Sequence, residues 1–175
     1  MQDLIATFEA SATEAAAQVR RVRANPDDVR RAVREITAAA ESIVLGAGEF
    51  LPGGMMEKLR DLMGVLDAPT DEQLSRAEVG ICGAFAGVAS SGSVCIAMGA
   101  PLVTTTSLLM PLHLVLLTVD RIVRRPRDLF DPAYLGGEAL KRNLVFITGP
   151  SATADMGPLV RGVHGPHQLQ ILLLE

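Results

Sequence analysis

Serine, aspartate and histidine side chains gather in one short stretch, residues 149–166, with the sequence GPSATADMGPLVRGVHGP. Ser151, Asp155 and His164 are the residue types of a nucleophile, an orienting acid and a base. No nucleophile-elbow spacing accompanies them, so the pattern favours ligand binding over catalysis by this trio. A purely structural interpretation also stays open, in which Ser151 and Thr153 cap a helix and His164 forms a hydrogen bond within a glycine-rich turn.

The elements around these residues suggest how they are positioned. The apolar run 144–148 predicts a strand buried on both faces, and Gly149-Pro150 ends it. A helix is expected from near Ser151 to about Arg161. The N-terminus of such a helix carries unpaired N–H groups and a partial positive charge, and Gly149 lets the backbone approach closely. We therefore expect a small carboxylate or phosphate anion there, at the carboxyl edge of the sheet.

The position of His164 depends on the direction of the last strand. If that strand runs parallel to 144–148, His164 falls at the opposite sheet edge from Ser151, because the connecting helix is about as long as a strand. Either the last strand is antiparallel, or His164 lies outside the Ser151 site. Both arrangements are compatible with the sequence.

Two further candidates lie earlier in the chain. Ser90, Ser91, Gly92 and Ser93 form a turn whose hydroxyl groups either line a pocket or make a plain polar turn. His113 begins an apolar run, where a hydrogen-bonded core or edge histidine is more common than a ligand-binding one. No residues show the spacing of a metal-ligand cluster, and no metal site is expected.

Composition narrows the class of protein. The 175 residues carry a net charge of −4, with one Tyr, five Phe and no Trp, which argues against nucleic-acid binding. The length suits one domain with a substantial core. Cys82 and Cys95 lie in apolar runs and are expected to be buried. No signal-peptide pattern opens the sequence, and the apolar run 108–119 is too short to span a membrane, so a cytoplasmic location is expected.

Apolar strands alternate with amphipathic helices, which predicts an α/β layered domain with a largely parallel sheet. A heptad-like stripe predicts that the first helix packs either on its own domain or on a neighbouring subunit, which leaves a homodimer open. Between the second and third strands, 84–93 is expected to be a loop. Helices are predicted over 1–24, 26–40, 55–63, 71–77 and 128–135, and strands over 43–45, 79–82, 94–97, 114–119 and 169–174.

The chain from residue 78 onward resembles the LUD-domain family, in particular its lactate-utilisation protein C branch. The resemblance rests on AEVGICGAFAGVASSGSVCIAMG, PLHLVLLTVDRIV, NLVFITGP, GPSATAD and GVHGP, which occur in order. It implies a three-layer Rossmann-like fold related to ribose-phosphate isomerases and coenzyme A transferases. An N-terminal helical arm (1–40) would precede the LUD domain (41–175). The family turn usually carries a glutamate where this sequence has Ser90, and the covalent chemistry of that carboxylate would be lost here.

The resemblance implies a subunit that takes part in oxidising L-lactate to pyruvate beside iron–sulfur oxidoreductase partners, itself accessory or binding a small anion. Two cysteines cannot supply the four thiolates of a typical iron–sulfur cluster, so clusters are expected on the partners and no cofactor on this chain. The alternative is a stand-alone enzyme of the coenzyme A transferase or sugar-phosphate isomerase-like fold, which acts on an acyl or phosphorylated substrate.

Overall fold

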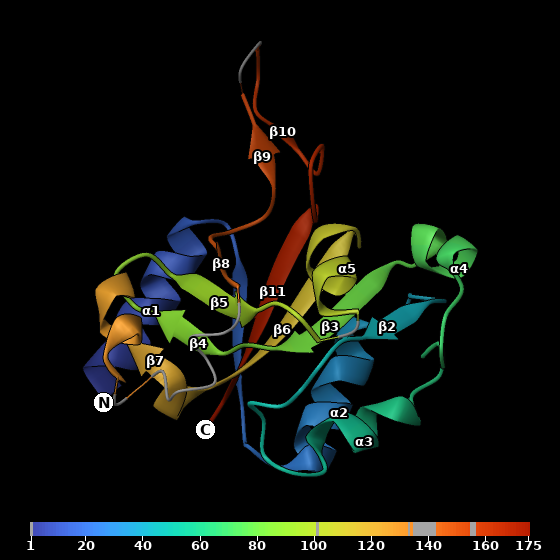
Figure 1. Ribbon diagram of the computed structural model, residues 1–175, viewed down its shortest axis with the longest axis horizontal. Coiled ribbons are helices and arrows are strands. Elements are labelled where there is room, and N and C mark those ends of the chain that lie inside the picture. Colours follow the sequence, from blue (N-terminus) through green and yellow to red (C-terminus); the bar gives the residue numbers. More distant parts are fainter. Residues whose placement is uncertain (1, 101, 133, 135–142, 155–156) are drawn as a thin grey trace.

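Five parallel strands form the main sheet in the order β1-β11-β6-β3-β2 (Figure 1). The computed structural model describes residues 2–100, 102–132, 134, 143–154 and 157–175. The predicted α/β architecture with a parallel sheet is confirmed. The strands of this sheet are β1 (Gln18–Val22), β2 (Ile43–Leu45), β3 (Val79–Gly83), β6 (Leu112–Thr118) and β11 (Gln168–Leu174).

The central strands β3, β6 and β11 are apolar on both faces because both faces are covered. On one face lie α2 (Pro26–Ile36) and α3 (Met55–Arg60), whose buried side chains pack on the sheet. The predicted start of α2 is confirmed, since the Asn25 side chain accepts a hydrogen bond from the Asp27 backbone N–H. The predicted capping box of α4 (Asp71–Arg76), between Thr70 and Gln73, is also present.

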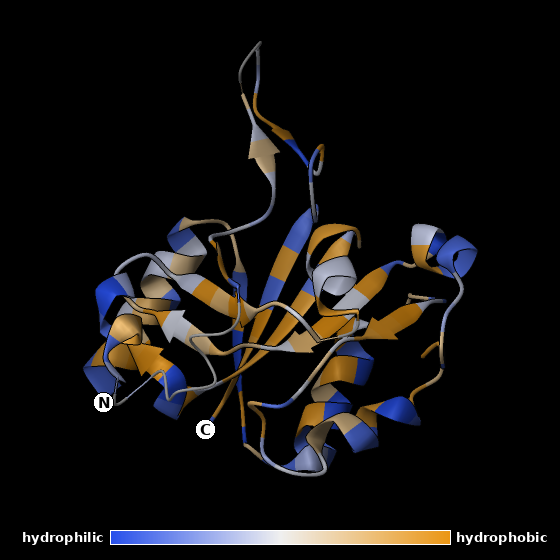
Figure 2. Cartoon of the chain, in the orientation of Figure 1, coloured by the Kyte–Doolittle hydropathy of each residue, from blue (hydrophilic) through white to orange (hydrophobic). Residues whose placement is uncertain are grey.

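The opposite face is covered by α1 (Gln2–Glu14), α5 (Val103–Leu108) and a smaller sheet. Ile5 and Phe8 of α1 belong to the same buried cluster as Val115 and Leu117 of β6. The smaller sheet has the order β7 (Ile122–Val123), β4 (Ala86–Val88), β5 (Ser93–Ala97) and β8 (Leu144–Ile147). Figure 2 shows the hydrophobic colour concentrated in the strands and on the helix faces turned toward them. Two 3₁₀ helices, η1 (Val119–Arg121) and η2 (Pro126–Phe130), flank β7.

The prediction of one helix over residues 1–24 is wrong. The helix stops at Glu14, Ala16 adopts a left-handed φ of 66°, and the chain then enters β1. The heptad-like pattern of apolar residues continues past this point. The backbone of 18–22 nevertheless pairs with β11, and these hydrogen bonds form only if the segment is extended. The N-terminal segment therefore supplies an edge strand of the main sheet.

The segment after residue 143 also differs from the prediction. β8 is a partly exposed edge strand of the smaller sheet, paired antiparallel with β5, and it does not lie in the parallel sheet. The predicted helix from Ser151 is wrong: β9 (Ala152–Thr153) pairs antiparallel with β10 (Val160–Arg161) in a projecting hairpin (Figure 1). The β-branched residues Thr153 and Val160 face each other across the strands.

Two smaller predictions are also corrected. The segment 84–93, expected to be a loop, contains the short strand β4, which bridges the two neighbours β5 and β7. Where a helix was predicted over 128–135, the structure has the 3₁₀ helix η2 up to Phe130 and α-helical backbone at Pro132 and Tyr134, while residues 133 and 135 lie outside the described part. Short apolar runs do not by themselves distinguish these alternatives.

Close packing of α5 on β3 requires glycine at position 80. A Cβ there would collide with the backbone of Thr106 in α5. We expect Gly80→Ala to lower the free energy of unfolding by about 1–3 kcal/mol, because the helix must move away from the sheet. Urea titration followed by circular dichroism measures this change.

The matched control is Gly53→Ala. A Cβ at Gly53 would meet nothing within 4 Å. This variant should keep the stability of the parent chain or gain slightly, since alanine restricts the unfolded chain. Equal destabilisation by both substitutions would contradict the packing argument.

Candidate functional site

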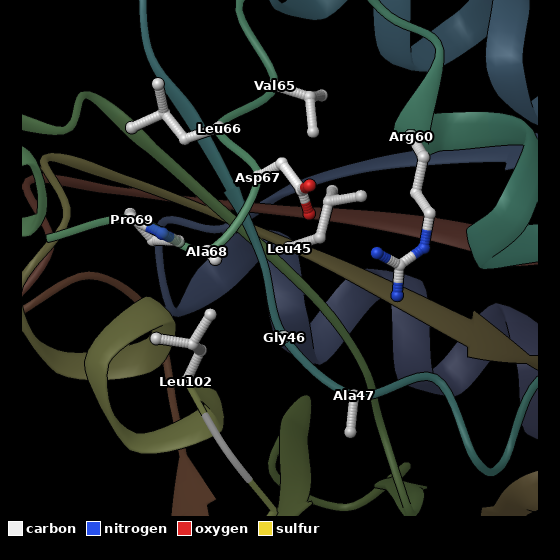
Figure 3. A pocket seen from close by; sticks show the side chains of 10 residues that line it. All are labelled: Leu45, Gly46, Ala47, Arg60, Val65, Leu66, Asp67, Ala68, Pro69 and Leu102. Carbon is white, nitrogen blue, oxygen red and sulfur yellow. The ribbon is translucent and has the colours of Figure 1, made fainter.

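A cavity of about 580 Å³ opens at the carboxyl end of β2, the edge at which open α/β sheets bind ligands (Figure 3). Its wall comes from three parts of the chain: the end of β2, the end of α3 with the segment that follows it, and Leu102, the residue before α5. The volume falls in the usual range of small-molecule sites. The lining residues are Leu45, Gly46, Ala47, Arg60, Val65, Leu66, Asp67, Ala68, Pro69 and Leu102.

Two opposite charges share this cavity. Arg60 is the last residue of α3, and Asp67 follows the short segment that bridges to the edge of β2. In Figure 3 the guanidinium group and the carboxylate both extend toward Leu45 and the middle of the lining. Arginine can bind a carboxylate or phosphate through two parallel hydrogen bonds, and an aspartate can accept a hydrogen bond from a hydroxyl group. The pair can therefore orient a ligand that carries both an anion and a hydroxyl.

The wall of this cavity contains unusual backbone conformations. Among the described residues, the non-glycine positions with positive φ are Ala16, Ala68 and Leu102. Ala68 (φ 44°) and Leu102 (φ 62°) both line the cavity. A left-handed conformation costs a residue with a Cβ about 1–2 kcal/mol, and such residues are enriched at functional sites. Packing of the surrounding fold keeps Ala68 and Leu102 in these conformations despite this energetic cost.

A buried polar pair lies behind the cavity wall. A Cβ on Gly46 would stand 3.1 Å from Cys82 Cβ and 3.0 Å from Thr106 Oγ1, so glycine alone separates the cavity from these side chains. Cys82 Sγ lies 3.2 Å from His113 Nε2, and both side chains are fully buried. His113 Nδ1 is buried and has no hydrogen-bonding partner among the described residues. His113 is the second residue of β6, and its burial beside Cys82 agrees with the predicted core histidine.

The Cys82–His113 pair is electrically neutral. Burial raises the pKa of the Cys82 thiol to about 12 and lowers the pKa of His113 to about 4. Thiol reactivity requires the thiolate, which this environment disfavours. Burial also raises the pKa of Cys95 to about 12, and the prediction that both cysteines are buried is confirmed. The pair is a packed core contact in this conformation and not an activated nucleophile.

The structure brings the Ser90–Ser93 turn and Gly149 together, but against a helix. Gly92 (φ 65°) meets the backbone of Ala12, and Gly149 (φ 71°) meets the carbonyl of Ala15, so a Cβ at either glycine would collide with the end of α1. Ser93 Oγ lies 2.6 Å from both Ser91 Oγ and Thr148 Oγ1. These hydroxyl groups join the turn to the end of β8. Ser90, the first residue of the turn, is exposed and lines a small cavity with Arg124 and Arg125.

The other predicted site residues lie at the base of the hairpin. The Ser151 N–H donates to the Pro166 carbonyl, and the Ser151 carbonyl accepts from the Gly162 N–H, each at 2.9 Å. Ser151 and the loop with His164 are therefore adjacent, but beside the amino end of β11, so the predicted carboxyl-edge location is wrong. Thr153 lies in β9, and Asp155 lies outside the described residues. His164 is exposed and lines a separate cavity.

Sequence reasoning missed Arg60 and Asp67. The available signal was the buried strand 43–45 followed by Gly46, which marks a carboxyl strand end where a ligand can approach the backbone. Nothing in the spacing of Arg60 and Asp67 distinguishes them from other surface charges. Tertiary structure places them around the same strand end.

Within the described part of the chain, no three histidine, cysteine, aspartate or glutamate side chains are grouped to hold a metal ion. Among the described helices, none is long and apolar enough to cross a membrane. The expectation that clusters reside on partner proteins stays a prediction.

The buried His113 should make stability depend on pH. Its pKa falls from 6.5 to about 4 on folding, so between these values the unfolded chain binds a proton that the folded chain does not. Its contribution is complete above pH 6.5 and is lost as pH falls toward 4. We expect His113→Gln to reduce the loss of unfolding free energy over this interval, as measured by urea titration. The exposed control His164→Gln should keep the parent pH dependence, and an unchanged profile in His113→Gln would contradict this assignment.

Three comparisons place the chain among known proteins. A solved DUF162 family protein from Deinococcus radiodurans shares its fold, with a TM-score of 0.73, 18% identity and coverage of 99% of this chain and 98% of that one. An uncharacterised protein of Neisseria meningitidis serogroup B is 28% identical over 110 residues, 62% of this chain. That match covers 47% of the relative, so it spans about half the length of that protein. The LUD domain model matches residues 5–174, and the chain belongs to the LUD-domain family.

Proposed function

We propose that this chain is a subunit of a lactate-oxidation system and that the cavity of Arg60 and Asp67 binds a small carboxylate. The match of the LUD domain model to residues 5–174 carries the lactate-related part of the proposal. Arg60 would hold the carboxylate, and Asp67 would accept a hydrogen bond from the 2-hydroxyl group of L-lactate. Oxidation would use iron–sulfur partner proteins in the cytoplasm, with this chain binding the ligand or supporting the assembly.

The carboxylate half of this proposal concerns Arg60. We expect Arg60→Met to weaken L-lactate binding roughly three- to tenfold, a moderate effect because the guanidinium group is solvent-exposed. Isothermal titration calorimetry with L-lactate measures the change. Arg76→Met is the matched control, since Arg76 is an exposed arginine of α4 paired with Glu72 outside the cavity. Equal affinity of the parent and Arg60→Met for L-lactate would remove this cavity from the proposal.

The same titrations test whether Asp67 determines which ligand is preferred. A carboxylate that lines a binding cavity favours a ligand with a hydroxyl donor over one that lacks it. L-lactate should therefore bind more tightly than pyruvate, and Asp67→Asn should remove the difference, because the asparagine amide can donate to the keto oxygen. A preference for L-lactate that persists in Asp67→Asn would show that Asp67 does not read the hydroxyl.

The partner half of the proposal needs a separate experiment. The tagged full chain, purified from cells of its source grown on L-lactate, should retain iron–sulfur oxidoreductase subunits, identified by mass spectrometry and by stoichiometric iron. The chain produced alone should be colourless, because its two cysteines are buried and cannot complete a typical cluster. A brown isolated protein, or the absence of such subunits from the lactate-grown complex, would contradict this half.

A stand-alone enzyme of the coenzyme A transferase or sugar-phosphate isomerase-like fold is the second candidate. The cavity volume of about 580 Å³ favours it, since this space is far larger than lactate requires. Titration with acetyl-coenzyme A and ribose 5-phosphate distinguishes the two. Binding of either probe that depends on Arg60, together with no response to L-lactate, would favour the enzyme.

A further inference from the structure

The hairpin of β9 and β10 projects away from both sheets (Figure 1), and Figure 2 shows hydrophobic residues along it. Leu159 is 59% exposed, Val160 53% and Val163 54%. Two strands that pair over two residues each are marginally stable on their own in water. A projecting hairpin with this composition is therefore better explained by contact with another surface than by solvent on all sides.

A groove of about 460 Å³ lies at the base of the same hairpin. Its floor is formed by the end of α5 and the turn before β6, where Leu109 is 67% exposed. The groove is wide enough to receive two or three aliphatic side chains. Its lining residues are Leu108, Leu109, Pro111, Gly162, Val163, His164, Gly165 and His167.

We infer that the hairpin and this groove form a two-fold interface between two copies of the chain. A two-fold axis perpendicular to the hairpin places two hairpins side by side and antiparallel, so the outer part of each reaches the base of the other. Leu159 and Val160 of one copy then lie over Leu109 of its partner. The apolar donor and the apolar acceptor occupy one contiguous patch, as an isologous contact requires.

Charge and area both favour a second copy as the occupant. The stretch 150–168 contains only two residues of the Lys, Arg, Asp and Glu types, Asp155 and Arg161, so it offers little to a highly charged partner. On the order of fifteen residues per copy would contribute, which corresponds to about 1,000 Å² buried across both copies. This area suits a dimer of moderate affinity. The inference is independent of the ligand and partners in the proposed function.

The first experiment measures the mass of the full chain by light scattering and sedimentation velocity over a range of concentrations. We expect a concentration-dependent species of twice 18.5 kDa. Leu109→Asp and Val160→Asp should each weaken dimerisation at least tenfold, while their urea unfolding transitions stay like that of the monomeric parent. Met63→Asp is the control, because Met63 is 94% exposed but lies outside the patch.

Disulfide trapping tests the arrangement itself. The two native cysteines are buried, so introduced thiols report on the surface alone. Mixing Leu159→Cys with Leu109→Cys should give an intermolecular disulfide between the two variants, whereas Met63→Cys should give none with either. A chain that is monomeric at every concentration, dimers that persist in both aspartate variants, or failure of the mixed pair to cross-link would overturn the inference. A monomer would leave the hairpin to a different partner or to a membrane surface.

Discussion

Burial of the apolar strands β3, β6 and β11 between two covered faces is the constraint on which the rest of this structure depends. Leu114 and Leu116 of β6 pack toward α2 and α3, while Val115 and Leu117 pack toward α1 and the smaller sheet. Because side chains alternate along a strand, both faces must be covered at once, one by α2 and α3 and the other by α1, α5 and the smaller sheet. The cavity lies at the end of the edge strand β2, beyond the covered part of the sheet. A site at this position leaves the packing of the core intact.

Glycine residues allow helices to pack closely on both sheets. Gly80 allows α5 to rest on β3, and Gly92 and Gly149 allow the end of α1 to approach two turns of the smaller sheet. At Gly92 and Gly149 the space beside the serine-rich turn and the end of β8 is filled by the backbone at the end of α1. Gly46 lines the cavity and also packs closely against the side chain of Cys82. The Cys82 thiol stays protonated because it is buried.

The candidate site combines a fixed frame with exposed charges. Ala68 and Leu102 line the cavity in left-handed conformations, while Arg60 and Asp67 reach it from different segments. Exposed charges contribute little to folding stability, so they are free to serve recognition. The buried His113 behaves in the opposite way, since its neutral state is tied to the packing of the core. The charged residues that line the cavity and the polar groups tied to core packing are thus different residues.

The sequence by itself determined four of the five strands of the parallel sheet, because apolar runs such as 43–45, 79–82 and 169–174 have no other place than a covered interior. It also determined the starts of α2 and α4, which depend on contacts between Asn25 or Thr70 and residues within three positions. Tertiary structure decided the rest. Residues 18–22 became a strand since β11 offered hydrogen bonds, residues 152–153 paired with residues 160–161 beside Ser151, and Arg60 and Asp67 came to line one cavity at the end of β2. Each of these outcomes depends on partners distant in the chain, and local patterns carry no record of such partners.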